Sequence, residues 1–422
     1  MNLWQPWSLR HLVADLAEGR STPETALKRC RARIAETEGE VTAWVAVGPD
    51  APETAEGPLH GVPFGVKDII DVAGHPTRCG SALRADADPA GQDAAIVSAW
   101  RETGVTVVGK TVTTEFAFFA PGPTRNPAAP GHTPGGSSSG SAAAVASGQV
   151  PLAIGSQTAG SVTRPAAYCG VASLVMTHGR FPVEGVSGLS PSLDSHGFYA
   201  AGAADLAVAW RALTRTAEPA VPDPARPPRV LLWSADPLGA VGEPMQQALE
   251  TARTRMTDAG AVVEPFPEER LIADLTAAHP VIMSYEAARE RAAELAEADR
   301  LSEPLARLLR TGAATSDDDY ETARSTVAAA RTRVAELLAS YDVVVGPAAP
   351  GAAPAGLDAT GDPVLSRAWQ ALGLPVVTVP GLRDAAGLPL GIQVIGPANG
   401  EDQLLVQSTW IEAALAPERQ QS

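Results

Sequence analysis

The sequence predicts an α/β fold, in which one α/β/α domain surrounds a mostly parallel, twisted mixed sheet flanked by helices. Three observations lead to this prediction. Of the 422 residues, 45% are hydrophobic and 19% are charged, so the chain can bury a large core. Short apolar runs that end at Gly or Pro recur along the chain, and Ala-rich helical segments separate them. We therefore expect a single domain over residues 1–422.

Two helices precede the first predicted strand. Ser8 stands before Leu9 and Leu12 as a capping residue, and Thr22-Pro23 opens the second helix with proline in its first turn. Apolar runs of strand length then predict strands at residues 42–47, 62–66, 105–109, 152–156, 230–233, 262–266 and 343–346, with a helix at 93–103. Two further strands, at 376–379 and 391–395, precede a closing helix at 401–415.

One segment departs from this alternation. Residues 268–341 are charged throughout, and apolar positions such as Val327 and Val334 recur at helical spacing, which predicts a helical insertion. The Ala- and Pro-rich stretch from Thr216 to Pro228 is the one candidate linker. We interpret it as a surface crossover, because the segments on either side have the pattern of strands in one sheet.

The charge of the chain excludes some classes of partner. A net charge of −16 disfavours nucleic acid and anionic membranes, and no local cluster of Lys or Arg offsets it. We find neither a signal peptide nor an apolar run of membrane length, so we expect a cytoplasmic protein. The cysteines Cys30, Cys79 and Cys169 form no CxxC pair, which predicts buried free thiols and no zinc site. The sequence leaves open whether the chain forms a homodimer.

The most unusual loop is Pro134-Gly-Gly-Ser-Ser-Ser-Gly-Ser141. A phosphate-binding loop would need a lysine that is missing here. A GxSxG nucleophile motif centred on Ser138 would need a strand directly before it, and the three prolines in residues 127–134 prevent one. From this loop alone, the remaining alternative is a flexible Gly/Ser loop that caps a helix.

Two other positions favour a catalytic interpretation. Ser161 follows a predicted strand and two small residues, where backbone N–H groups can face an oxyanion without interference from side chains. Lys67 ends an otherwise apolar strand, where a charged amine is costly. Lysine is rare in this chain, and unlike arginine it can become a neutral base. Lys67 is therefore a candidate base, with a salt bridge to Asp68 or Asp71 as the structural alternative.

Together, these three windows resemble the amidase-signature family. The resemblance is carried by the strand-ending Lys67, by the GGSS loop that contains Ser137, and by Ser161, which stands 24 positions after Ser137. It extends over almost the whole chain, with a catalytic signature core at about residues 58–200. Further matching segments are Thr124-Arg-Asn126-Pro, Ser192-Leu-Asp194-Ser and Gly387-Leu-Pro-Leu-Gly-Ile-Gln393.

The resemblance implies hydrolysis of a linear carboxamide by a Ser-cisSer-Lys triad. Ser161 would attack the carbonyl carbon, Ser137 would pass the proton from behind a cis peptide bond, and Lys67 would receive it. Formation of the acyl-enzyme on Ser161 would release ammonia or an amine, and its hydrolysis by water would then release the carboxylic acid. The resemblance implies no metal and no cofactor. The oxyanion hole would consist of the backbone N–H groups of Thr158, Ala159, Gly160 and Ser161.

The sequence departs from the common family pattern near Ser161. Gln157 stands where an aspartate is usual, and Thr163 stands where an arginine is usual, with Arg164 one place later. Ala159 replaces a glycine in the same turn. We expect Gln157 and Thr163 to form a neutral hydrogen-bonded support in place of an ion pair.

The identity of the substrate is less well determined. We expect a small-molecule amide, and the candidates to line an apolar pocket are Phe118, Phe119, Tyr168 and Trp369, although core packing is the usual role of such side chains. A glutaminase subunit of an amidotransferase is disfavoured, because the loop at 118–124 does not resemble the segment that such subunits use near glutamine. An amide-forming acyltransferase and a non-catalytic binding relative are further alternatives.

Overall fold

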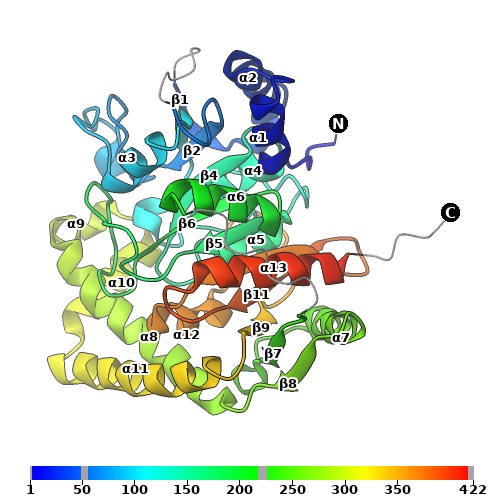
Figure 1. The fold of residues 1–422 in the computed structure, drawn as a ribbon. Helices are drawn as coiled ribbons and strands as arrows, with labels where there is room; N and C mark the ends of the chain where they lie inside the picture. The colour runs from blue at the N-terminus through cyan, green and yellow to red at the C-terminus, as the bar shows by residue number, and fades with distance from the viewer. Residues whose placement is uncertain (1, 49–55, 217–225, 417–422) are drawn as a thin grey trace.

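Eleven strands form one sheet in the computed structural model, which describes residues 2–48, 56–216 and 226–416 (Figure 1). Their order across the sheet is β1-β3-β2-β4-β6-β5-β10-β11-β9-β7-β8. In chain order the strands are β1 (Trp44–Val47), β2 (Pro63–Lys67), β3 (Thr106–Thr111), β4 (Leu152–Gln157), β5 (Ala172–Val175), β6 (Ser195–Ala200), β7 (Arg229–Leu232), β8 (Val262–Pro265), β9 (Val343–Pro347), β10 (Val376–Arg383) and β11 (Pro389–Ile395).

The sheet is mixed, which confirms the α/β class, but the predominance of parallel pairs was wrong. Among the described residues, β2 pairs in parallel with β3 and β4, and β7 pairs in parallel with β8 and β9. The other six pairings are antiparallel. Two of the strands that join the parallel groups, β5 and β6, were missed. Because β6 begins with Ser195, His196 and Gly197, it lacks the apolar run that marked the other strands.

Helices cover the sheet, and the predicted N-terminal and C-terminal helices are present. Ser8 caps the first helix, and Pro23 lies in the first turn of the second. The helices are α1 (Leu9–Ala17), α2 (Pro23–Val41), α3 (Ala95–Arg101), α4 (Ser139–Ala146), α5 (Thr163–Cys169), α6 (Ala203–Thr214), α7 (Glu243–Asp258), α8 (Glu269–Glu290), α9 (Ala292–Ala296), α10 (Glu303–Ala314), α11 (Asp317–Leu338), α12 (Val364–Leu372) and α13 (Glu401–Leu415).

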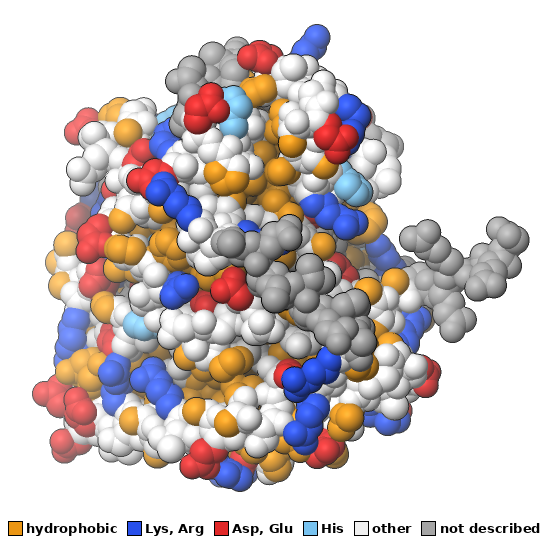
Figure 2. Space-filling model, viewed as in Figure 1, with side chains coloured by type: hydrophobic (Ala, Val, Ile, Leu, Met, Phe, Trp, Pro, Cys, Tyr) orange, Lys and Arg blue, Asp and Glu red, His pale blue; other side chains and the backbone are white. Residues whose placement is uncertain are grey.

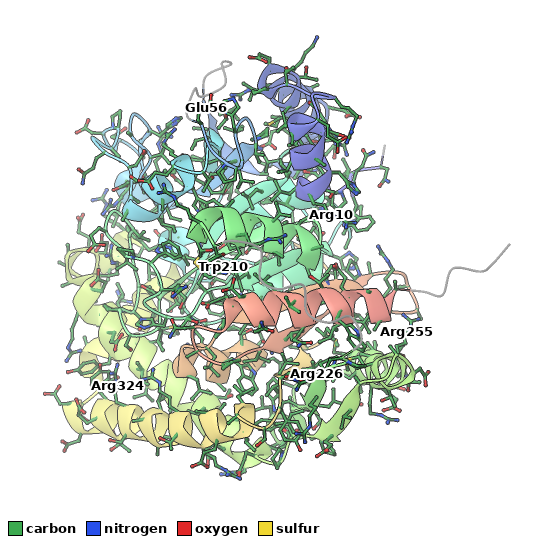
Figure 3. All side chains as sticks on the ribbon, viewed as in Figure 1. Arg10, Glu56, Trp210, Arg226, Arg255 and Arg324 are labelled. Atoms are coloured by element: carbon green, nitrogen blue, oxygen red, sulfur yellow. The ribbon has the colours of Figure 1, made fainter. Side chains whose placement is uncertain are left out.

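Helices α6, α7 and α13 are tied together by polar contacts as well as by packing. The Trp210 indole of α6 donates a hydrogen bond to Asp402 at the start of α13, at 2.9 Å (Figure 3). At the other end of α13, Arg255 of α7 donates to the carbonyl of Leu415. In the view of Figure 1, α6 and α13 lie in front of the central strands, and α7 lies at the right, beside β7 and β8.

The charged segment 268–341 is helical, as the sequence predicts. It contains α8 to α11, and α8 packs against α10, α11 and α12 (Figure 1). Of the predicted crossover at 216–228, residues 217–225 lie outside the described residues. Acidic and basic side chains are interspersed on the face shown in Figure 2. No helix among the described residues is both long and apolar enough to cross a lipid bilayer. Cys30, Cys79 and Cys169 are buried free thiols.

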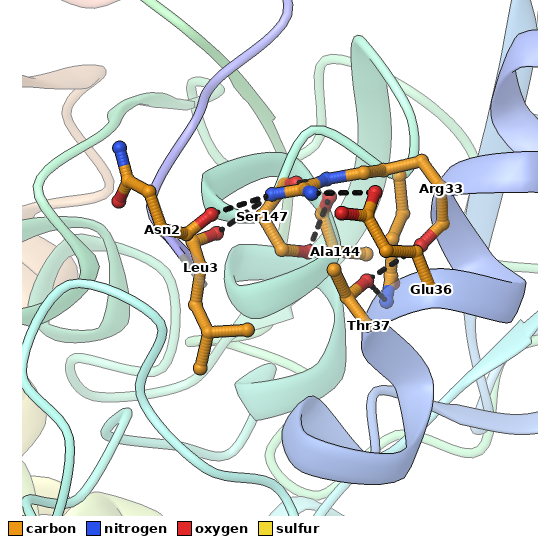
Figure 4. A network of polar contacts seen from close by, with 8 residues as sticks. Asn2, Leu3, Arg33, Glu36, Thr37, Ala144 and Ser147 are labelled. Carbon is orange, nitrogen blue, oxygen red and sulfur yellow. Dashed lines mark hydrogen bonds and ion pairs between the residues drawn. The ribbon is translucent and has the colours of Figure 1, made fainter.

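Helix α4, which follows the Gly/Ser loop, is held by the N-terminal part of the chain. Arg33 of α2 donates from Nε to the carbonyl of Ser147, which ends α4, at 2.8 Å (Figure 4). The same guanidinium pairs with Glu36 at 2.8 Å and donates to the carbonyls of Asn2 and Leu3. One side chain thus connects the N-terminal segment, α2 and α4.

Candidate active site

Lys67 ends β2, between the parallel neighbours β3 and β4, and its side chain is fully buried. Its Nζ lies 2.7 Å from the Ser137 hydroxyl and 2.9 Å from the Ser156 hydroxyl. Burial lowers the pKa of Lys67 to about 7, against the opposing field of Asp194. Burial therefore shifts Lys67 towards the neutral amine that a general base requires.

The carboxylate next to Lys67 in sequence does not neutralise it. Asp68 pairs with Lys110 at 3.0 Å, and both side chains are fully buried. Asp68 also accepts a hydrogen bond from the backbone N–H of Arg78 at 3.2 Å. In the described part of the chain, Lys67 forms no ion pair with Asp68 or Asp71, so the structural alternative left open by the sequence was wrong.

Ser137 lies at the base of the Gly/Ser loop, directly after a cis peptide bond from Gly136, which is where the resemblance implies one. Its neighbour Ser138 is fully buried, and its hydroxyl donates to the carbonyl of Ser156 on β4 at 3.3 Å. The backbone N–H of Ser138 donates to the carbonyl of Ser161 at 3.3 Å. Ser138 is thus a connection between the loop and β4, which argues against a nucleophile centred on it.

Ser161 lies in the turn between β4 and α5 and is 8% exposed. A small hollow, which we call the inner hollow, brings Ser161 together with Ser137. Thr158, Ala159 and Gly160, expected to provide oxyanion contacts, line the same hollow. The sequence-predicted residues Ser137 and Ser161 therefore face a common space, and Ser137 connects that space to the buried Lys67.

Two residues that the sequence did not assign to the site hold the turn before Ser161. His279 of α8 donates from Nε2 to the carbonyl of Thr158 at 2.8 Å, and burial lowers the pKa of His279 to about 4. Asp194 accepts a hydrogen bond from the Thr158 hydroxyl at 2.6 Å. His279 lies inside α8 and has no local motif that could have indicated its contact with Thr158.

Asp194 is itself anchored by backbone donors. Its second oxygen accepts hydrogen bonds from the N–H groups of Leu189 and Ser190, at 2.7 and 3.0 Å. Burial raises the pKa of Asp194, while these hydrogen bonds and the one from Thr158 act in the opposite direction. The carboxylate thus links the turn before Ser161 to the segment 189–194.

The hydrogen bonds around Gln157 involve only neutral groups, as expected, but the side chain that partners Gln157 is not the expected Thr163. The Gln157 carbonyl oxygen accepts hydrogen bonds from the backbone N–H groups of Val162 and Thr163, at 2.9 and 3.0 Å. Its amide nitrogen donates to Gln370 of α12 at 3.0 Å. The Thr163 hydroxyl has no partner among the described residues. The second side chain of the support is therefore Gln370 rather than Thr163.

The four aromatic pocket candidates fall into two groups. Phe118 and Phe119 form an edge-to-face pair with ring centroids 4.8 Å apart, and both line the inner hollow. They also line an adjoining outer hollow of about 670 Å³. Tyr168 and Trp369 are instead buried in the core, where Trp369 packs edge-on against Trp233. These two residues do not line the inner or outer hollow.

The comparisons with known proteins agree on one family. A family model described as Amidase matches residues 44–405. The chain is 33% identical over 418 residues to the A subunit of glutamyl-tRNA(Gln) amidotransferase from Treponema pallidum strain Nichols, covering 84% of this chain and 82% of that protein.

Solved structures have the same fold. The A subunit of the glutamyl-tRNA(Gln) amidotransferase from Thermotoga maritima superposes with a TM-score of 0.84 at 25% identity, covering 98% of this chain and 96% of that one. The peptide amidase of Stenotrophomonas maltophilia superposes with a TM-score of 0.77 at 27% identity, covering 96% of each chain.

Proposed function

The chain belongs to the amidase-signature family, and from that premise we propose that it hydrolyses a linear carboxamide through an acyl-enzyme on Ser161. The observation that carries the proposal is the 2.7 Å contact between Lys67 Nζ and the hydroxyl of Ser137, which lines the same hollow as Ser161. In the proposal, the buried amine of Lys67 receives the proton of Ser161 by way of Ser137 through this contact.

In the proposed first half-reaction, Ser161 Oγ attacks the amide carbon. Its proton passes to Ser137 Oγ, whose own proton passes to Lys67 Nζ. Backbone N–H groups of residues 158–161 stabilise the oxyanion. When the tetrahedral intermediate collapses, the proton returns from Lys67 through Ser137 to the leaving nitrogen. Water then repeats the sequence on the acyl-enzyme and releases the carboxylic acid, with Ser161 restored.

A panel of simple carboxamides, assayed for ammonia release, tests this proposal. We expect turnover by the wild type and a loss of several orders of magnitude in Ser161→Ala, with the same circular dichroism spectrum. Ser139→Ala is the matched control, because Ser139 starts α4 and does not line the inner hollow. Near wild-type ammonia release by Ser161→Ala would refute the proposed nucleophile.

The relatives suggest a second candidate function, that of a glutaminase subunit of an amidotransferase. Glutamine should then be the preferred amide in the panel, with turnover that depends on partner subunits. Under the hydrolase proposal, the isolated chain turns over simple amides. An assay with an ester substrate and added hydroxylamine distinguishes these two functions from that of an amide-forming acyltransferase. The acyltransferase would produce more hydroxamate than free acid.

A further inference from the structure

His279 is a fully buried side chain that joins α8 to the turn before the nucleophile. Its Nε2 lies 2.8 Å from the carbonyl oxygen of Thr158. Because a carbonyl oxygen only accepts hydrogen bonds, the imidazole proton is on Nε2. Burial lowers the pKa of His279 to about 4, so the ring is neutral at neutral pH and Nδ1 carries no proton there. His279 is therefore a neutral donor to this one carbonyl.

This contact fixes one peptide unit of the turn. In a trans peptide unit, the carbonyl of one residue and the N–H of the next lie in one plane and point in opposite directions. The bond between Thr158 and Ala159 is trans, because the one cis bond within the described residues joins Gly136 and Ser137. A donor that holds the Thr158 carbonyl therefore sets the direction of the Ala159 N–H.

The Thr158 carbonyl depends on His279 alone. In the described part of the chain, no other donor forms a hydrogen bond with this oxygen. The carbonyl of Ser161 is instead held from the Gly/Ser loop, by the backbone N–H of Ser138 at 3.3 Å. His279 belongs to the helical insertion and stands 121 positions after Thr158. A helix outside the signature core thus controls one peptide unit of the turn.

The Ala159 N–H is available to an oxyanion. Among the residues that the structure describes, the backbone N–H groups of Ala159, Gly160 and Ser161 donate to no acceptor. All three residues line the inner hollow. An amide whose carbonyl accepts a hydrogen bond is polarised, which strengthens its own N–H as a donor. His279 thus acts on the Ala159 N–H both through its direction and through its polarity.

We propose that His279 is a positioning residue, which holds the peptide unit between Thr158 and Ala159 so that the Ala159 N–H faces the oxyanion formed when Ser161 attacks. This inference rests on the proposed hydrolase function. Asp194 supports the same arrangement, because it accepts a hydrogen bond from the Thr158 hydroxyl at 2.6 Å. Thr158 is therefore held at its backbone by His279 and at its side chain by Asp194.

Two amide side chains of different length test this role. His279→Gln brings an N–H close to the position of Nε2, whereas the shorter side chain in His279→Asn does not reach it. Removing one oxyanion donor costs about a hundredfold or more in kcat, so we expect misdirection in His279→Asn to cost about tenfold or more. The KM for a simple carboxamide should change little, because the oxyanion forms only after binding. His279→Gln should recover most of the loss. Wild-type kcat in His279→Asn, or equal losses in both variants, overturns the inference.

His196 provides the matched control. It is a buried histidine whose Nε2 lies 2.9 Å from the carbonyl of Pro182, and its Nδ1, like that of His279, has no partner within the described residues. It does not line the inner hollow. We therefore expect His196→Asn to leave kcat unchanged. An equal fall of kcat in His196→Asn and His279→Asn would show a general effect of replacing a buried histidine, and the inference would fail.

A pair of inhibitors tests the inference when no substrate is known. Ser161 Oγ adds to the carbonyl carbon of phenethyl trifluoromethyl ketone, which becomes a hemiketal oxyanion while the serine proton passes through Ser137 to Lys67. The matching carbinol has no carbonyl carbon to attack. Calorimetry should show ketone binding weakened by about tenfold or more in His279→Asn, the loss expected when an oxyanion loses a hydrogen bond. Carbinol binding should stay the same.

The outcomes of this measurement separate the two proposals. A wild-type adduct on Ser161 that forms with equal affinity in His279→Asn overturns the inference about His279 alone. A wild type that forms no adduct on Ser161 refutes the proposed nucleophile, and the inference fails with it. If His279→Asn does not fold, His279→Leu, which also lacks a donor at this position, replaces it in both tests with the same expected results.

Discussion

At the scale of single residues, Lys67 carries the chemistry that we propose. Its burial lowers its pKa from the usual 10.5 to about 7, and its neighbours at Nζ are the hydroxyls of Ser137 and Ser156. A neutral amine can accept a proton from Ser137 while it donates to the carbonyl of Ser156 at 3.4 Å. Asp68, which follows Lys67 in sequence, pairs instead with Lys110 at 3.0 Å.

The pH dependence of turnover follows from this pKa. Because the base must be neutral, and the neutral fraction of Lys67 grows as pH rises, log kcat/KM for a neutral amide should rise with pH and level off above about 7. Lys67→Arg should be as inactive as Lys67→Ala, since arginine keeps its proton. Initial rates between pH 5 and 9 measure this profile. An active Lys67→Arg enzyme would show that position 67 acts only as a cation.

Gln157 offers a second prediction at this scale. Its amide nitrogen faces the side-chain oxygen of Gln370, whose own nitrogen already donates to the Ser195 hydroxyl and to the carbonyls of Gln157 and Leu193. Gln157→Glu would place a buried carboxylate oxygen against the Gln370 oxygen. We expect a loss of about 1–3 kcal/mol in the free energy of unfolding, measured with urea. The exposed Gln403 of α13 provides the control, and Gln403→Glu should be nearly neutral. Unchanged stability of Gln157→Glu would contradict the observed hydrogen-bond arrangement.

At the scale of elements, the position of Ser137 depends on how closely α4 approaches the sheet. Gly140 lies in the first turn of α4, and a Cβ there would come within 2.3 Å of the Ala43 oxygen and the Val112 nitrogen. Both are backbone atoms, which cannot rotate away. The glycine is therefore required for the helix that follows the Gly/Ser loop to lie against the sheet.

Two glycine substitutions test this requirement. Gly140→Ala should lower the free energy of unfolding by about 1–3 kcal/mol or more, because the added methyl overpacks backbone. Gly39→Ala, in α2, should raise it by up to about 1 kcal/mol, because its Cβ meets nothing within 4 Å and alanine favours a helix. Urea unfolding of both variants gives the comparison. Equal effects of the two substitutions would rule out the close approach of α4.

The elements themselves were predictable where a local pattern determined them. The closing helix α13 has the predicted bounds, and β4 differs by one residue at its end. Strands β5 and β6 were missed because their pairing depends on partners distant in sequence: β5 pairs with β10, and β6 pairs with β4. Local periodicity does not contain that information, so the antiparallel centre of the sheet could not be predicted.

At the scale of the whole molecule, the site combines residues that local motifs reveal with others that only the fold brings close. Lys67, Ser137 and Ser161 stand in recognisable windows. In the structure, Ser137 contacts the amine of Lys67 and lines the same hollow as Ser161. His279 and Gln370 come from α8 and α12, far along the chain, and have no motif of their own. Arg164 is a similar case, because only the folded structure shows that its buried Nη1 has no hydrogen-bond partner among the described residues.

The most direct test of the central claim asks which serine of the whole protein is reactive. A fluorophosphonate probe is allowed to react with the native enzyme, and the adduct is located by peptide mass spectrometry. We predict one adduct per chain, on Ser161, with none in Ser161→Ala and much slower labelling in Lys67→Ala, because the nucleophile then lacks its base. An adduct on Ser138, or undiminished labelling of Ser161→Ala, would contradict the account.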